Sequence, residues 1–269
     1  MTQVAVGGRL HFGFSNLSLS HSRLYGALGV ALDAPQVSLS ATPAASINAP
    51  PAIESVAATV CAQLGVDGVS LQVDTQTMLT VATAVADAYD KGIAVREIAP
   101  ALGRGGRSGI GVGTFEAGGF VLDGGHPTAR FTTARPQDGD WTVPPIAARH
   151  RIPDHWRFLL VIPDSEPGRS GDVEDDSIRT AIERAEPAIA DRISGLLTRR
   201  VLPAIAAGDA DRFGAAVAEI GRLNGAWYTD EQGGVYRPPV GELVDSLSGS
   251  PAIYGAGQSS WGPTVYGVT

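Results

Sequence analysis

The stretch GRGGRSGIGVGTFEAGGFVLDGG, residues 103–125 of 269, is the most unusual in the chain and the one on which its fold is decided. Apolar residues alternate along it and predict two strands joined by a turn at residues 117–119. Near its start Arg104 and Arg107 stand three positions apart among glycines, followed by Ser108. Guanidinium groups and free backbone amides both reach phosphate oxygens. The segment therefore predicts an anion cradle, with a solvated basic loop as the alternative.

The elements on either side of this stretch form strand-rich and helix-rich blocks rather than a strict alternation. Before it we expect extended runs at 4–14, 29–32, 37–41 and 69–73, and helices at 52–64, near 78–89 (with Asp74 as N-cap) and at 95–102. After it we expect a buried strand at 156–163, helices at 175–185, 188–207, 210–228 and 240–247, and short strands at 252–257 and 263–268. Such blocks favour an α+β fold in two lobes. We place these lobes at residues 1–150 and 151–269.

The amino-acid composition and net charge limit which classes of protein this chain can belong to. The 34 glycines favour tight turns and close backbone approaches over a helical bundle. A net charge of −8 argues against nucleic acid or an anionic membrane as the main partner. The chain has one cysteine, Cys61, which cannot form an internal disulfide, so a cytoplasmic location is expected. No uninterrupted apolar run of about 18 residues is present.

The strand at 9–14 carries a candidate catalytic pair. Strand alternation puts residues 9, 11 and 13 on one face and residues 10, 12 and 14 on the other. Arg9 and His11 on the first face would suit a phosphate or carboxylate beside a proton-transfer partner. The alternative is an exposed strand face without a ligand.

Two further glycine-rich segments are candidate binding loops. In RLYGALGVAL, residues 23–32, the glycines would let the backbone approach a ligand near Tyr25 and Gly26, although an ordinary hairpin looks similar. In GAGQSSWGP, residues 255–263, amide and hydroxyl groups lie close to an indole, which suits stacking on a flat ring. The second segment contributes a continuous set of candidates, Gly257, Gln258, Ser259, Ser260 and Trp261.

Several common sites are excluded because the sequence has no phosphate-binding GxxxxGK[ST] loop, no GxGxxG after the first strand, no HExxH and no zinc-type Cys/His spacing. What remains is a set of five ordered blocks: RLHFGF from Arg9, RLYGALGVALD from Arg23, the glycine-rich stretch from Gly103, WRFLLVIP from Trp156, and GAGQSSWGPTVYG from Gly255. Together they resemble the β-ribofuranosylaminobenzene 5′-phosphate synthase family of the GHMP kinase superfamily. The resemblance implies a ribosomal-protein-like N-terminal lobe and a ferredoxin-like C-terminal lobe.

The resemblance also implies an enzyme, a decarboxylating phosphoribosyltransferase. It would join 5-phosphoribosyl 1-diphosphate to 4-hydroxybenzoate or 4-aminobenzoate, with loss of CO2 and diphosphate, on the way to methanopterin-type cofactors. Mg²⁺ as cofactor and a homodimer are further expectations. On this basis Arg104 and Arg107 would hold phosphate groups together with Ser108 and Gly109, Arg9 would hold an anionic group, and His11 would meet the para substituent or transfer a proton.

Two departures from the family pattern bear on the chemistry. GHMP kinases commonly carry an aspartate at the position of Gly111, acting on the acceptor hydroxyl, and a glycine has no side chain to do so. Relatives also carry a glycine-rich phosphate loop where Val73 here runs straight into Asp74, Thr75 and Gln76, three residues that we expect to contact substrate. The alternatives are an ATP-dependent small-molecule kinase and a catalytically inactive ligand-binding homologue.

Overall fold

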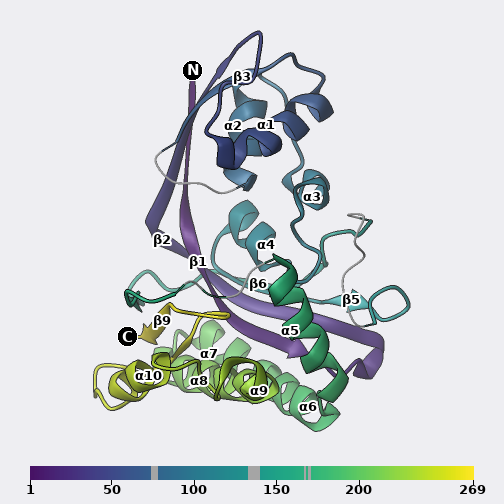
Figure 1. The fold of residues 1–269 in the computed structure, drawn as a ribbon. Helices are drawn as coiled ribbons and strands as arrows, with labels where there is room; N and C mark the ends of the chain where they lie inside the picture. Colours follow the sequence, from purple (N-terminus) through teal and green to yellow (C-terminus); the bar gives the residue numbers. More distant parts are fainter. Residues whose placement is uncertain (74–77, 133–139, 167, 169–170) are drawn as a thin grey trace.

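A long two-stranded ribbon runs through the centre of the fold (Figure 1). The computed structural model describes residues 1–73, 78–132, 140–166, 168 and 171–269. Strands β1 (Thr2–Asn16) and β2 (Arg23–Pro43) pair antiparallel along almost their whole length. The runs expected separately at 29–32 and 37–41 are therefore parts of one strand, because β1 supplies a continuous partner for both.

The ribbon continues into a six-stranded sheet of order β1-β2-β4-β6, with β3 and β5 also pairing with β2. The added strands are β3 (Val69–Val73), β4 (Phe120–Asp123), β5 (His126–Pro127) and β6 (Ile146–His150). Helices α1 (Pro51–Leu64) and α2 (Met78–Ala88) bury their apolar sides against the β3 end of this sheet, around Leu39, Val60 and Val85. The expected strand at 69–73 and the helix at 52–64 are confirmed.

The prediction of two strands within residues 103–125 is wrong in its first half. Residues Ile110–Ala117 form helix α4, and only β4 is extended. A Cβ atom on Gly113 would lie 2.9 Å from Ile146 Cδ1 and 3.0 Å from Val121 Cγ1, so glycine lets the helix pack directly on the sheet. Gly113, which contributed to the apparent strand alternation, thus permits close packing of the helix on the sheet.

The helix expected at 95–102 is interrupted. Short helical turns account for the remaining elements of the N-terminal half. Helix α3 (Val95–Ile98) is followed by a 3-10 turn, η2 (Pro100–Leu102), because the Pro100 ring has no amide proton to continue the helix. A second 3-10 turn, η1 (Ser20–Ser22), joins β1 to β2.

The second half pairs a small sheet with a layer of helices (Figure 1). Strands β7 (Phe158–Val161), β9 (Val265–Val268) and β8 (Gly255–Gln258) form an antiparallel sheet of order β7-β9-β8. The strand expected to be buried at 156–163 is an edge strand with Leu159 43% exposed, so that expectation was wrong, because only one face of β7 is covered.

The helical elements of this half are α5 (Gly171–Arg184), α6 (Pro187–Leu196), the π-helical turn η3 (Leu197–Val201), α7 (Leu202–Ala207), α8 (Ala210–Trp227), α9 (Thr229–Gln232) and α10 (Val240–Ser248). The helices expected at 175–185, 188–207, 210–228 and 240–247 are present, although a π-helical turn interrupts the second, and α9 was not predicted. Within the described residues, no helix is long and apolar enough to cross a membrane.

One hydrophobic core joins the two halves. Phe12 of β1 contacts Phe213 of α8 and Tyr266 of β9, with ring centroids 6.0 and 5.0 Å apart. The division at residue 150 falls between β6 and β7 and stays a prediction, because the two halves share this core. The functional groups described next lie where the halves meet.

Candidate active site

A wide cleft lies between the glycine-rich loop and the outer part of β1. It has a volume of about 420 Å³. Its walls are formed by the loop 103–108, the start of α4, residues 6–9, 11 and 14 of β1, Val37 of β2, Met78 and Leu79 of α2, Glu174 of α5, and Ser260. The polar side chains among them are Arg9, His11, Arg104, Arg107, Ser108, Thr114, Glu174 and Ser260. All three arginines that the sequence proposed for anion binding therefore line one cavity.

The glycine-rich loop is held in place from its outer side. Trp141 Nε1 donates to the Arg104 carbonyl at 2.9 Å, and His126 Nε2 lies 3.0 Å from the Gly105 carbonyl. The His126 ring is itself stacked on Phe131 with centroids 3.9 Å apart. These contacts fix the loop so that Arg104 lines the cleft, although three of the six residues 103–108 are glycine.

The carboxylate of Asp123 fixes the far end of the same loop. Its Oδ2 accepts from the Gly109 amide at 2.7 Å and its Oδ1 from the Gly125 amide at 2.9 Å. Burial raises the Asp123 pKa to about 6, against the lowering effect of these amides. The Gly109 amide is thus bonded within the protein, so the structure does not offer it to a substrate, while the neighbouring Ser108 lines the cleft.

Arg9 lies over the start of α4. A Cβ atom on Gly111 would sit 3.4 Å from Arg9 Nε and 3.5 Å from its Cζ, so the guanidinium occupies the space next to the bare glycine. Loss of solvation inside the cleft lowers the Arg9 pKa, and the nearby charge of Arg104 lowers it further. Two like charges in one cleft repel one another, so an anion bound between them gains from relieving that repulsion.

Arg107 is bound to carboxylates. Its Nη2 lies 2.6 Å from Glu174 Oε2, and its Nη1 contacts Asp175 Oδ1, both residues of α5. The Arg107 side chain is only 18% exposed. To hold a substrate phosphate, the guanidinium would have to exchange at least one of these partners. Arg107 thus ties the glycine-rich loop to α5.

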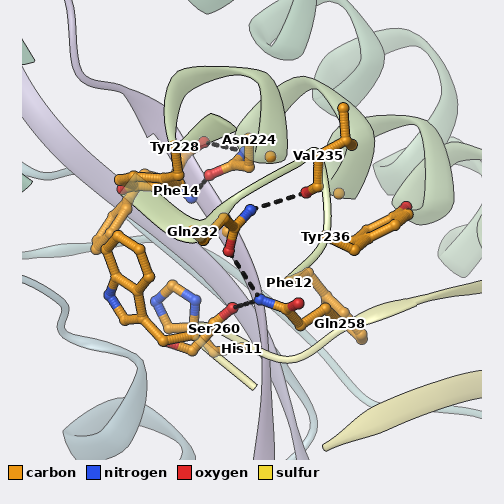
Figure 2. Close-up of a pocket in the computed structure, with 14 residues that line it drawn as sticks. His11, Phe12, Phe14, Asn224, Tyr228, Gln232, Val235, Tyr236, Gln258 and Ser260 are labelled. Carbon is orange, nitrogen blue, oxygen red and sulfur yellow. Dashed lines mark hydrogen bonds between the residues drawn. The ribbon is translucent and has the colours of Figure 1, made fainter. Parts of the chain in front are cut away.

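A second, smaller cavity adjoins the cleft and is largely aromatic. It has a volume of about 40 Å³. Figure 2 shows residues of β1, of the end of α8 and of the β8–β9 region facing one another around it. Its aromatic and polar lining residues are His11, Phe12, Phe14, Asn224, Tyr228, Gln232, Tyr236, Gln258, Ser260 and Trp261. Three residues, His11, Phe14 and Ser260, line both cavities.

A bulge in β1 shapes the wall that the two cavities share. The pairing with β2 shifts between His11 and Gly13, so the predicted alternation fails there and Phe14 lies beside His11, with ring centroids 5.1 Å apart. Asn224 of α8 holds the bulge, because its Oδ1 accepts from the Phe14 amide at 2.6 Å and its Nδ2 donates to the Phe14 carbonyl at 2.9 Å. Gly13 has a φ of 135° and no room for a side chain beside Asn224.

His11 is buried and neutral. Burial, and after it the charges of Arg9 and Arg107, lower the His11 pKa to about 3. Its Nδ1 has no hydrogen-bond partner among the described residues. The His11 backbone is tied to the C-terminal loop, since its amide donates to Ser259 Oγ at 3.1 Å and its carbonyl accepts from the Ser260 amide at 3.2 Å.

The loop after β8 is organised by Gln258. Its Nε2 donates to the Ser260 carbonyl at 2.8 Å and contacts Gln232 Oε1 at 3.2 Å, while its Oε1 accepts from the Arg237 amide at 3.0 Å. These bonds, drawn in part in Figure 2, leave Gln258 as a wall of the cavity rather than a free amide. Trp261 lines the same cavity with its ring 4.5 Å from that of Tyr228.

Other candidates lie away from both cavities. Tyr25 is 1% exposed and packs behind Phe14, with centroids 5.4 Å apart. Gly26 has a φ of 70° and faces Ser15 and Asp123, and Gly257 faces the Tyr266 ring. The structure therefore does not bring Tyr25, Gly26 or Gly257 to the cleft, because the strand pairing of β2 and β8 turns them into the core.

The three residues after β3 lie outside the described residues, so the substrate contacts of Asp74, Thr75 and Gln76 stay predictions. Conversely, the structure adds residues that the sequence did not single out, namely Asn224, Tyr228 and Glu174. These come from helices whose apolar spacing indicated only core packing. No local pattern marks a single polar residue on such a helix as part of a cavity.

Known proteins that are similar in sequence to this chain share one name. No protein-family model matches the chain. It is 34% identical over 200 residues to the Beta-ribofuranosylphenol 5'-phosphate synthase of Methanothermobacter thermautotrophicus, a match that covers 72% of this chain and 58% of that protein. It is 30% identical over 287 residues to the protein of the same name from Archaeoglobus fulgidus, covering 100% of this chain and 88% of that protein.

Solved structures share the fold at low sequence identity. The phosphomevalonate kinase of Streptococcus pneumoniae superposes with a TM-score of 0.68 at 14% identity, covering 100% of this chain and 91% of that one. The L. major mevalonate kinase gives a TM-score of 0.66 at 14% identity, covering 100% and 87%. The mevalonate pyrophosphate decarboxylase of Streptococcus pyogenes gives 0.61 at 9% identity, covering 99% and 88%.

Proposed function

The chain belongs to the beta-ribofuranosylphenol 5'-phosphate synthase family and has the GHMP kinase fold, and from this premise we propose that it joins 5-phosphoribosyl 1-diphosphate to 4-hydroxybenzoate. The ring carbon that bears the carboxylate forms a bond to ribose C1′, and the bond from C1′ to diphosphate breaks. The carbon–carboxylate bond then breaks, CO2 leaves, and its electron pair restores the aromatic ring. 4-Hydroxybenzoate is preferred to 4-aminobenzoate here because the relatives are named for a phenol product.

One observation carries the proposal. A cationic cleft opens beside an aromatic cavity, and the two share His11, Phe14 and Ser260. A sugar diphosphate bound in the first and a flat ring bound in the second would meet at this shared wall. Holding two reactants in contact in this way removes much of the entropic cost of their reaction.

GHMP kinases commonly carry, at the position of Gly111, an aspartate that acts on the acceptor hydroxyl. Here this position has no side chain, and the Arg9 guanidinium fills the space beside it. A phosphoryl transfer to a hydroxyl needs a group that takes the hydroxyl proton, whereas an aromatic carbon that attacks C1′ has no such proton to lose. Arginines in place of the acid suit the departure of a diphosphate, whose negative charge grows as the bond to C1′ breaks.

The aromatic acceptor needs electron density, and we assign to His11 the role of raising it. Because the His11 pKa is lowered to about 3, the ring is neutral at physiological pH and keeps a nitrogen lone pair. A hydrogen bond from the acceptor's hydroxyl to that nitrogen would make the ring a better nucleophile.

We extend the proposal to Mg²⁺ as a companion of the diphosphate. The described residues contain no group of three or more His, Cys, Asp and Glu side chains fit to hold an ion. Mg²⁺ binds well through substrate phosphates, waters and one or two carboxylates. Glu174, the acidic side chain that lines the cleft, would be its protein ligand, and the ion would stabilise the leaving diphosphate.

The direct test is release of labelled CO2 from carboxyl-labelled 4-hydroxybenzoate in the presence of phosphoribosyl diphosphate and Mg²⁺. We expect release that depends on all three components and not on ATP. Turnover that requires ATP hydrolysis would instead favour the kinase alternative. Binding of both substrates by calorimetry without any release would identify an inactive homologue.

Two finer expectations belong to the same proposal, a homodimer and a cytoplasmic location. Light scattering on the eluting protein would measure the mass of the assembly against the 27.8 kDa of one chain. Fractionation of the source cells would place it in one compartment.

A further inference from the structure

Three buried polar atoms of residues lining the small aromatic cavity have no hydrogen-bond partner among the described residues. One is the Tyr236 hydroxyl, and the two on the more deeply buried residues are the hydroxyl oxygen of Tyr228 and Nδ1 of His11. Both residues are only 8% exposed, and both line the cavity (Figure 2). A buried polar group without a partner costs free energy that a ligand can recover by bonding to it. A polar group of a bound molecule is therefore the natural partner of both atoms.

The size of the cavity limits which part of a ligand it can take. With about 40 Å³ of room it is too small for a whole benzoate, while the adjoining cleft has about 420 Å³. One end of a para-substituted ring fits in the cavity, and the opposite end extends past His11, Phe14 and Ser260 into the cleft.

The charges around the two cavities determine which end of the para-substituted benzoate enters the aromatic cavity. The cleft side carries Arg9, Arg104 and Arg107, which attract a carboxylate. The cavity side is aromatic and neutral, since burial raises the Tyr228 pKa well above its ordinary value and His11 is uncharged. A carboxylate would lose its solvation in the cavity without gaining a cation there.

The position of Tyr228 distinguishes it from the other tyrosine of the cavity. The charges that act on the Tyr228 hydroxyl include Glu174 and Arg107, both residues of the cleft. Those that act on Tyr236 are Arg222 and Asp245, on the other side. The Tyr228 ring also lies against Trp261, with centroids 4.5 Å apart. Tyr228 is thus the tyrosine of this cavity whose hydroxyl is influenced by the charges of the cleft.

We propose that the aromatic acceptor enters the cavity hydroxyl first, and that Tyr228 and His11 together bind its phenol oxygen. The Tyr228 hydroxyl donates a hydrogen bond to that oxygen, and the lone pair of His11 accepts the hydrogen bond of the phenol O–H. This assignment rests on the proposed function and adds the orientation of the acceptor and the residue that selects it. The ring carbon bearing the carboxylate then faces the cleft, where the ribose is held.

The same pair of bonds serves the reaction. As the ring carbon bonds to ribose C1′ and diphosphate leaves, the ring loses electron density and the phenol oxygen takes on carbonyl character, with its proton moving to His11. The Tyr228 O–H stabilises that carbonyl oxygen. When CO2 leaves, the electron pair of the broken bond restores the ring and the proton returns from His11 to the oxygen. No other reactant is required.

The arrangement selects a hydroxyl over an amino group. A phenol oxygen accepts one hydrogen bond and donates another, which matches Tyr228 and His11. The nitrogen of 4-aminobenzoate shares its lone pair with the ring and accepts poorly, so the Tyr228 hydroxyl would stay unpaired beside it. A site built to bond a hydroxyl discriminates strongly against an analogue that cannot satisfy it.

The test compares equilibrium binding of 4-hydroxybenzoate and 4-aminobenzoate to the full chain, without phosphoribosyl diphosphate. We expect Tyr228→Phe to weaken 4-hydroxybenzoate binding about tenfold, as for a lost hydrogen bond in a buried site. Binding of 4-aminobenzoate should change by less than about twofold. Tyr266→Phe is the matched control, since it removes another buried tyrosine hydroxyl of the same half that lines neither cavity. It should leave the ratio of the two affinities unchanged, and thermal unfolding checks that both variants fold.

Each outcome decides the proposal. Equal loss for both acceptors, no loss for either, or a wild-type protein that binds neither acceptor overturns it. Failure of the proposed function has a different signature, because selective binding sensitive to Tyr228→Phe without CO2 release would retain the acceptor site and reject the transferase reaction.

Discussion

The cleft and the aromatic cavity are neighbours built by different means. The cleft is formed mainly by backbone, a glycine-rich loop and the start of α4, with arginines projecting from it. The cavity is formed by side chains from β1, the end of α8 and the β8–β9 loop. Glycine backbone can approach a large, charged and hydrated ligand closely, whereas packed rings shape a small dry space.

This difference separates two tasks within one site. The cleft gathers charged groups, and Arg107 is paired there with two carboxylates of α5. In the binding mode that we propose, the cavity determines which atom of the acceptor faces the ribose. Because His11 lines both the cleft and the cavity, a substitution in one should also affect binding in the other through His11. Three experiments test how far the two tasks are separable.

The largest effect is expected from Arg107→Ala. Loss of charge-assisted bonds to phosphate of about 1.5–3 kcal/mol would weaken phosphoribosyl diphosphate binding by roughly 10- to 100-fold. Benzoate binding should change by less than about threefold, as measured by calorimetry. Equal effects on both ligands would remove the phosphate role and leave Arg107 as a tie to α5.

A companion pair of variants sharpens this result. Asp175→Asn removes one carboxylate partner of Arg107, so it should tighten phosphoribosyl diphosphate binding a few-fold if the guanidinium exchanges partners. Asp176→Asn is its matched control, since it makes the same charge change one residue later, where the carboxylate pairs with Arg179 instead. The same tightening in both variants would reflect net charge alone.

A smaller effect is expected from the pH dependence of folding. Because the His11 pKa is lowered from 6.5 to about 3 in the folded protein, its contribution to stability is present above pH 6.5 and is lost as the pH falls toward 3. Between pH 7 and pH 5 this loss amounts to about 2 kcal/mol, at 1.36 kcal/mol per pH unit. Urea unfolding of wild type and His11→Gln at both pH values measures it.

The comparison of the two proteins isolates His11 from other groups. His126 has a pKa lowered to about 4 and adds acid sensitivity of the same sign, but it is present in both. If the wild type and His11→Gln lose the same free energy of unfolding on acidification, His11 is not held neutral by its surroundings.

The smallest of the three effects concerns the space between Gly111 and Arg9. Gly111→Asp should place a carboxylate beside the guanidinium and weaken phosphoribosyl diphosphate binding about tenfold through loss of net positive charge in the cleft. Gly111→Ala adds only a methyl group at ordinary contact distance and should stay within about threefold. Equal effects of the two substitutions would point to shape rather than charge.

Local periodicity determined most of the regular elements. Strand β3 and helices α1, α8 and α10 were predicted at nearly their observed bounds, because each carries an uninterrupted pattern of its own. The prediction failed at α4, where glycines required for packing on the sheet imitate strand alternation. It failed also at Phe14, where a bulge held by Asn224 reverses the face of the strand.

The sequence by itself determined the types of group in the site, arginines among glycines and an indole beside amides and hydroxyls, because these stand in short continuous segments. Only the tertiary structure decided that Tyr228 and Asn224 complete the site, that Arg107 is held by α5, and that Tyr25 and Gly26 lie in the core. These facts depend on contacts between residues far apart in the chain. Such contacts are fixed by packing and burial, which no local pattern encodes.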